Sequence, residues 1–245
     1  MIEHSIIENY ILSLGISPDE GDIENLQAYL DILFEYNKSI NLVGTKNHDE
    51  ILIRHFFDCL SIFNFLNLPD LKTTKINKIL DIGTGAGLPG ILLAIFLKKS
   101  KIYLLDSKNK AITFLKIVIN TLKLDNAYVL SGRAEELAHD TRYREKFDIV
   151  VSRALAKTSV LSELAIPFIK VGGRAVLYKS KNLSEELQFS GKIISAMGSV
   201  IESIFEVKIP SLDEYRALLI LKKVSPTIYK YPRKYGKILS ENLHN

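Results

Sequence analysis

Residues 78–90 read Lys78-Ile79-Leu80-Asp81-Ile82-Gly83-Thr84-Gly85-Ala86-Gly87-Leu88-Pro89-Gly90. The apolar start predicts a buried β-strand, which runs into three glycines spaced by one residue and then into a helix beginning near Pro89. Glycines at this spacing let the backbone approach whatever lies above the end of the strand. The segment therefore predicts a ligand-binding loop at the carboxyl end of a strand.

A carboxylate follows the next predicted strand. Residues 102–106 form a second apolar run that ends in Asp106, 25 residues after Asp81. At this position a carboxylate can accept hydrogen bonds from both hydroxyls of a ribose. The loop and Asp106 together predict a cofactor that contains a nucleoside.

The same loop fits two cofactors, because residues 85–90 also match the dinucleotide pattern G-x-G-x-x-G. Three features favour S-adenosylmethionine. Asp81 would attract an amino group and repel a pyrophosphate. Gly172 and Gly173 lie between a predicted helix and strand, as is typical of class I methyltransferases. Finally, no tyrosine is followed four residues later by lysine, and no second domain is available to bring a dehydrogenase substrate.

The rest of the chain divides into two parts by its periodicity. Residues 4–14, the segment after Pro18 and residues 50–65 carry apolar residues at helical spacing, and Ser17 to Glu20 fit a capping box with proline at the first helical position. Downstream, apolar runs alternate with helical windows, with predicted strands at 78–82, 102–106, 127–130, 148–152, 174–178, 199–209 and 216–223. The last two are too close in sequence for an intervening helix, so they form an antiparallel pair at the sheet edge.

These patterns predict an α/β fold, the Rossmann-like fold of class I S-adenosylmethionine-dependent methyltransferases. We expect a seven-stranded, mostly parallel sheet with an antiparallel edge strand, preceded by a helical N-terminal extension. The expected domains are the extension, residues 1–72, and a methyltransferase domain with a basic C-terminal tail, residues 73–245.

Composition narrows the cellular context. The 245 residues carry a net charge of +4, but residues 1–50 hold ten acidic and two basic side chains, so the remainder carries +12. A basic body of this kind often meets an anionic partner. One cysteine and five scattered histidines predict a reducing compartment and no metal site, and no apolar run predicts a membrane span. We expect a cytoplasmic, monomeric protein without membrane contact.

Several motifs in order resemble one known family, the RsmG family of bacterial 16S ribosomal RNA guanine-N7 methyltransferases, also called glucose-inhibited division protein B. The similarity covers nearly the whole chain and rests on these segments: Asn41-Leu42, Arg54 to Leu60, Asp81 to Gly90, Leu105-Asp106-Ser107, Gly132 to Glu135, Phe147-Asp148 with Ser152-Arg153-Ala154, and Tyr231 to Lys234. The resemblance implies methyl transfer from S-adenosylmethionine to N7 of guanine-527 in 16S ribosomal RNA, with the small ribosomal subunit as partner.

Site residues follow from the pattern and the resemblance together. The resemblance implies that Gly83 and Leu88 contact S-adenosylmethionine, that Ala134 and Glu135 hold its adenine side, and that Arg153 lies at the cofactor and guanine pocket. The full predicted cofactor-binding set is Asp81, Gly83, Gly85, Gly87, Leu88, Asp106, Ala134, Glu135 and Arg153. The predicted RNA contacts are Arg54, His55, Lys110, Lys179, Arg233 and Lys234.

The sequence lacks the motifs that two other classes of base methyltransferase need. No proline is followed by another, so the Pro-Pro motif of adenine-N6 enzymes is absent, and Cys59 lies in an apolar helical stretch that predicts core packing instead of nucleophilic attack. Guanine N7 carries a lone pair and no proton, so alignment suffices. We expect no essential acid or base, with Arg153 positioning the substrate.

Three other functions fit parts of the pattern. A methyltransferase of a small molecule or protein would not depend on Arg233 and Lys234. A non-catalytic RNA-binding assembly factor would retain RNA affinity after Asp81→Ala or Gly85→Arg. A nicotinamide-dependent reductase would be stabilised against heat by its own cofactor and not by S-adenosylmethionine.

Overall fold

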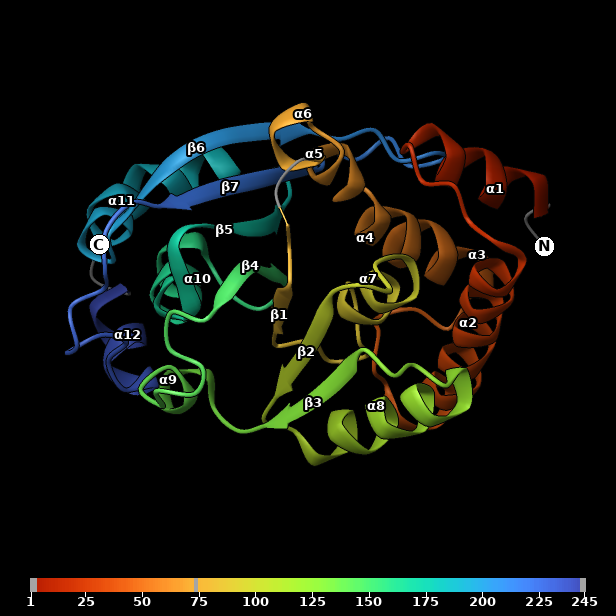
Figure 1. Cartoon of the computed structure of the whole chain (residues 1–245), viewed down its shortest axis with the longest axis horizontal. Helices are drawn as coiled ribbons and strands as arrows, with labels where there is room; N and C mark the ends of the chain where they lie inside the picture. The colour runs from red at the N-terminus through yellow and green to blue at the C-terminus, as the bar shows by residue number, and fades with distance from the viewer. Residues whose placement is uncertain (1–3, 73–74, 243–245) are drawn as a thin grey trace.

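The computed structural model describes residues 4–72 and 75–242 and is built around one seven-stranded sheet (Figure 1). The strand order is β3-β2-β1-β4-β5-β7-β6. The strands are β1 (Lys78–Ile82), β2 (Lys101–Asp106), β3 (Ala127–Ser131), β4 (Phe147–Arg153), β5 (Ile169–Lys179), β6 (Ser199–Glu206) and β7 (Ala217–Lys223). The predicted fold class is thereby confirmed.

Strand direction follows the connections. β1 pairs in parallel with both β2 and β4, so that Ile79 faces Ile102 on one side and Ile149 on the other. The same-sheet crossovers β1–β2 and β2–β3 contain helices, whereas the short link from β6 to β7 contains none, and β7 is antiparallel to both β5 and β6. The predicted antiparallel pair is therefore correct.

Helices cover both faces of the sheet (Figure 1). One face packs against the N-terminal helices together with two later ones, and the other packs against helices of the second half. The first group comprises α1 (His4–Ser13), α2 (Glu20–Ile40), α3 (His48–Ile51), α4 (Asp58–Leu60), α5 (Phe63–Leu66), α6 (Pro69–Lys72), α7 (Gly90–Phe96) and α8 (Asn109–Leu122). The second half contributes α9 (Ala134–Leu137), α10 (Thr158–Ala165), the 3-10 turn Ile166–Phe168, α11 (Leu183–Ala196) and α12 (Tyr235–Asn242).

The N-terminal helices differ locally from the prediction. The expected helix at 50–65 is broken, with a π-helix, Leu52–Phe57, between α3 and α4. The expected capping box at Ser17 is shifted, because Asp19 is the N-cap of α2 and its partner is Asp22. The aspartate makes both reciprocal hydrogen bonds and leaves Pro18 outside the helix.

Buried side chains of the N-terminal helices join a single apolar cluster with the sheet residues Ile79, Val151 and Val176. The boundary between residues 72 and 73 adjoins the undescribed residues 73–74, and it stays a prediction. None of the described helices is long and apolar enough to cross a membrane.

Candidate functional site

The glycine loop after β1 is fastened to the end of β2 by backbone hydrogen bonds. The N–H groups of Gly83 and Thr84 donate to Leu105 O at 2.8 and 3.1 Å, and the N–H of Gly85 donates to Asp106 Oδ2 at 2.9 Å. Gly83 and Gly85 have φ angles of 67° and 55°, in the left-handed region that glycine adopts without penalty. A Cβ on Gly85 would meet only Gly83 O, at an ordinary contact distance of 3.9 Å, and Gly85 lines the cavity described below. The loop therefore leaves room above Gly85 for a ligand.

Asp81 lies beneath this loop and is fully buried. Its Oδ2 accepts hydrogen bonds from Thr84 Oγ1 at 2.6 Å and from the N–H of Gly90 at 2.8 Å, whereas Oδ1 has no partner in the described part of the chain. Burial raises the pKa of Asp81 from 3.8 to about 7, against the opposing effect of these two donors. Asp81 thus fixes the shape of the loop at a cost in desolvation.

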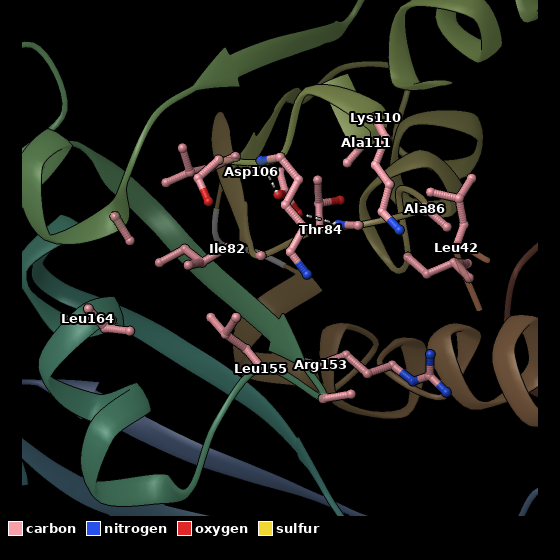
Figure 2. Close-up of a pocket in the computed structure, with 18 of the residues that line it drawn as sticks. Leu42, Ile82, Thr84, Ala86, Asp106, Lys110, Ala111, Arg153, Leu155 and Leu164 are labelled. Atoms are coloured by element: carbon pink, nitrogen blue, oxygen red, sulfur yellow. Dashed lines mark hydrogen bonds between the residues drawn. The ribbon is translucent and has the colours of Figure 1, made fainter. Parts of the chain in front are cut away.

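A cavity of about 560 Å³ opens above the loop at the carboxyl ends of β1, β2 and β4 (Figure 2). Its walls come from the strand ends, from the link after α2 and from the start of α12. The lining residues are Asn41, Leu42, Val43, Gly44, His55, Ile82 to Ala86, Leu88, Leu105 to Lys108, Lys110, Ala111, Gly132 to Glu135, Arg153 to Leu155, Leu164 and Tyr235. This is the edge where ligands bind in open parallel sheets.

Asp106 is placed to receive a ribose. Its Oδ1 accepts the N–H of Lys108 at 2.9 Å and its Oδ2 accepts the N–H of Gly85, so the carboxylate is held on both sides. Each carboxylate oxygen has a second lone pair for a further donor. Because Asp106 lines the cavity, its two remaining lone pairs can accept hydrogen bonds from the two hydroxyls of a ribose.

Most of the predicted cofactor residues meet at this cavity, and two do not. Gly83, Gly85, Leu88, Asp106, Ala134, Glu135 and Arg153 line it. Asp81 lies below the loop. Gly87 is buried, and a Cβ there would lie 2.5 Å from Ile91 Cγ1, so Gly87 is needed for packing. Tyr29 of α2 packs over it and donates from its hydroxyl to Ala86 O at 2.7 Å.

Arg153, at the end of β4, connects the sheet to the π-helix. Its Nε is 2.8 Å from Asp58 Oδ2, and its Nη2 donates to Arg54 O at 2.7 Å and lies 2.8 Å from His55 Nδ1. Burial opposes the charge of Arg153, but nearby Cys59 and Asp58 act to raise its pKa, and the net shift is upward. A π-turn widens the helix here, as is frequent at functional sites. Sequence reasoning assigned no role to Asp58.

The predicted RNA contacts are dispersed. His55 and Lys110 line the cavity, and Lys110 Nζ also donates to Ile40 O at 3.1 Å. Arg54 pairs with exposed Glu214 at 2.7 Å, and Lys234 is exposed.

Two of these predicted RNA contacts form ion pairs in which one partner is buried. Lys179 is buried and paired with Glu186 at 2.8 Å, and Arg233 Nη2 is 2.7 Å from fully buried Glu163. An RNA role for Lys179 and Arg233 stays a prediction, because RNA phosphates would have to compete with Glu186 and Glu163 for these two side chains.

Sequence reasoning missed three parts of the cavity wall. The link at residues 41–44 is held by Asn37, whose Oδ1 accepts the N–H groups of Leu42 and Val43 and whose Nδ2 donates to Val43 O. Leu155 packs over Gly83, and Tyr235 arrives from the C-terminal helix. Of these three, only the link at residues 41–44 had a signal in the sequence, the family motif Asn41-Leu42.

The strand order, the glycine loop above β1 and the carboxylate that ends β2 define a class I methyltransferase. Among known families, the GidB family, described as rRNA small subunit methyltransferase G, matches residues 22–238. The chain belongs to this family, as the sequence resemblance predicted.

Full-length relatives carry the same name. The chain is 40% identical over 240 residues to "Ribosomal RNA small subunit methyltransferase G" of Clostridium tetani (strain Massachusetts / E88), which covers 98% of each chain. It is 42% identical over 239 residues to the protein of that name from Clostridium botulinum (strain Loch Maree / Type A3), again covering 98% of each.

Proposed function

We propose that the chain transfers the methyl group of S-adenosylmethionine to N7 of a guanine in 16S ribosomal RNA, the base numbered guanine-527 in the RsmG resemblance. One observation carries the proposal. A single cavity contains a half that fits a nucleoside, at Asp106, and a half beside β4 whose polar side chains, Arg153 and His55, are not placed to take a proton from a base. The names of the relatives support a ribosomal RNA substrate. The proposal places the protein in the cytoplasm as a monomer.

The nucleoside half lies over β1, β2 and β3. Asp106 would accept the ribose hydroxyls, Gly83, Gly85 and Leu88 would contact the cofactor along the loop, and Ala134 with Glu135 would hold its adenine. S-adenosylmethionine, when bound, supplies a methyl group on a positively charged sulfur. Asp81 acts by holding the loop between Thr84 and Gly90.

The other half lies beside β4, where Arg153 and His55 line the cavity. Burial and the neighbouring Arg153 lower the pKa of His55 to about 3, and its Nδ1 faces the Arg153 guanidinium. Neither side chain can therefore remove a proton from a base. Guanine N7 has no proton to lose. Its lone pair would take the methyl group from the cofactor, which would leave as a neutral thioether, and the positive charge would pass to the purine. Alignment and exclusion of water remain the enzyme's tasks.

The cavity rim gives the substrate an electrostatic approach. Lys108, Lys110 and Arg133 line the cavity and are exposed on the nucleoside side, and Lys230, Lys234 and Lys237 are exposed near α12. Such charges neutralise phosphates without reading base sequence. We assign them to holding the RNA backbone around a base that enters the cavity.

The test is methylation of small subunits that lack the modification, with radiolabelled S-adenosylmethionine and mapping of the labelled nucleosides. The inactive control is Gly85→Leu, which adds a bulky side chain at a glycine that lines the cavity. Its matched partner is Gly172→Leu, because Gly172 has a φ of 87° but no atom near its Cβ, so the backbone penalty is shared without loss of the cavity.

We expect 7-methylguanosine with the unchanged enzyme and with Gly172→Leu, and none with Gly85→Leu. Absence of label on free RNA and on subunits, while S-adenosylmethionine still raises the melting temperature, would refute the ribosomal substrate. Retained RNA affinity without turnover would then favour an assembly factor.

A further inference from the structure

The orientation of His55 is fixed by its neighbour. Arg153 Nη2 lies 2.8 Å from His55 Nδ1. A guanidinium can donate hydrogen bonds but cannot accept them, so Nδ1 must be the acceptor and carries no proton. A neutral imidazole has one N–H, which in His55 is therefore on Nε2, at the opposite edge of the ring.

The imidazole is held neutral by its surroundings. Burial comes first, and the guanidinium groups of Arg153, Arg54 and Arg216 then act in the same direction to lower the pKa of His55. The acidic groups nearby are committed elsewhere: Asp58 accepts from Arg153 at 2.8 Å, and Glu214 pairs with Arg54 at 2.7 Å and with Arg216 at 2.8 Å.

The Nε2–H group is available to a ligand. None of the described residues accepts a hydrogen bond from His55 Nε2, and this atom is not among the fully buried unpaired ones. His55 lines the cavity on the β4 side, whereas Asp106 holds the nucleoside side across β1. In Figure 2, Arg153 and Leu155 lie on one side of the cavity, and Asp106 and Lys110 on the other. His55 and Arg153 thus line the part of the cavity that lies away from the nucleoside half, where a base would have room.

We propose that the Nε2–H of His55 donates a hydrogen bond to O6 of the target guanine and so selects guanine over adenine. This inference rests on the proposed function. Guanine presents two acceptors, O6 and N7, at this edge, whereas adenine carries an N6 amino group in place of O6. Two N–H groups facing each other would repel, so adenine is rejected.

A single neutral donor suits this reaction better than a basic side chain. Arginine or lysine commonly contacts O6 and N7 of guanine together, which would cover the atom that has to react. A cation would also oppose the positive charge that the purine gains during transfer. His55 can hold O6 and leave N7 open, and Arg153 acts on the base through the histidine as a positioning residue.

The experiment combines one substitution with one change in the substrate. Subunits are reconstituted with 16S RNA that carries guanine, 2-aminopurine or hypoxanthine at the mapped position. 2-Aminopurine lacks O6 and keeps N7, whereas hypoxanthine keeps both. Each RNA is methylated by the unchanged enzyme, by His55→Ala and by the control His48→Ala, whose histidine contacts Asp31 outside the cavity lining.

We expect 2-aminopurine to lower kcat/KM of the unchanged enzyme and of His48→Ala about tenfold or more, and hypoxanthine to have little effect. His55→Ala should lose a similar factor on guanine and nothing further on 2-aminopurine, because one hydrogen bond is removed in both cases. If the two losses multiply, or if 2-aminopurine is methylated as well as guanine, the inference is wrong. If no enzyme form methylates guanine, the proposed function itself fails.

A second measurement does not depend on turnover. Nitrogen-15 spectra of the unchanged protein report which ring nitrogen carries the proton, and the His55 signal is the one that disappears in His55→Ala. We expect one proton, on Nε2, from pH 6 to pH 8. A proton on Nδ1, or a doubly protonated ring, would overturn the inference.

Discussion

Replacing Asp81 by asparagine should change the pH dependence of stability by a calculable amount. Burial raises the pKa of this carboxyl from 3.8 to about 7 in the folded protein. Between these values the folded state binds a proton that the unfolded state has lost, so the free energy of unfolding falls as pH rises. At 1.36 kcal/mol per pH unit, the full difference is about 4 kcal/mol. About 2.3 kcal/mol of it accumulates between pH 5 and pH 7, and about 2.7 kcal/mol by pH 8, because the slope falls as the folded carboxyl itself loses its proton.

Asparagine removes this titration and keeps the shape of the site. Its amide oxygen can accept both donors that now bond to Asp81 Oδ2, from Thr84 and Gly90, while its NH₂ takes the place of the unpartnered Oδ1. The buried amide donors cost about 1–3 kcal/mol when unpaired. The variant should therefore equal or exceed the unchanged protein in stability at pH 8 and fall below it at pH 5.

The assay is urea unfolding of both proteins without ligand at pH 5, 6, 7 and 8. The difference in free energy of unfolding should move by about 2.7 kcal/mol in favour of the variant between pH 5 and pH 8. A difference that stays constant across this range, or that moves the other way, would refute the assignment of a buried, destabilised carboxylate under the loop.

Asp148 offers a control with the opposite sign. Burial acts to raise its pKa, but Lys170 and the N–H groups of Lys78 and Asn77 lower it overall. Its charged form therefore stabilises the folded state above the unfolded pKa, and this contribution is lost as pH falls through the lower folded value. Asp148→Asn should lower stability at pH 7, and the deficit should shrink on acidification.

Three further outcomes can be checked with purified variants. Gly90→Ala should lower the free energy of unfolding by about 1–3 kcal/mol, because its Cβ would overlap Leu104 Cδ2 of β2. The measurement is urea unfolding, and equal stability of the two proteins would contradict this packing. Tyr29→Phe should cost about 1 kcal/mol by leaving Ala86 O without its hydroxyl donor, measured by thermal unfolding with and without S-adenosylmethionine. Arg233→Ala should cost about 3–5 kcal/mol, because fully buried Glu163 loses the guanidinium that neutralises it and keeps only the backbone N–H of residue 233; unchanged stability with weaker RNA binding would show instead that the arginine serves the RNA.

The fold and the nucleoside half of the site could be predicted because their signals are local. A buried parallel strand has a continuous apolar run, and the glycines and Asp106 directly follow such runs. The sequence of a loop motif does not tell which of its residues face the ligand and which face the protein interior. Asp81 and Gly87 belong to the same motif as Gly85, yet one lies under the loop and the other packs against Ile91.

The rest of the site depends on contacts between distant segments. Glu163 and Arg233 are 70 positions apart, and Arg153 meets Asp58 across 95 positions. Pairs at this separation leave no periodicity in a single sequence, so the prediction treated Arg233 as a free cation. The position of Tyr235 in the cavity wall could not be predicted for the same reason. Its helix packs against Val160 and Leu164, which are far from it in sequence.

The hydrogen bond from Tyr29 to Ala86 has a consequence for dynamics across the molecule. The glycine loop and α2 cannot separate without breaking this bond, and Lys110 ties α8 to the end of α2 at Ile40. Local opening of the N-terminal helices and loosening of the loop are thus one cooperative event. A cofactor that stiffens the loop should slow amide hydrogen exchange in the buried turns of α2, a helix that it does not touch.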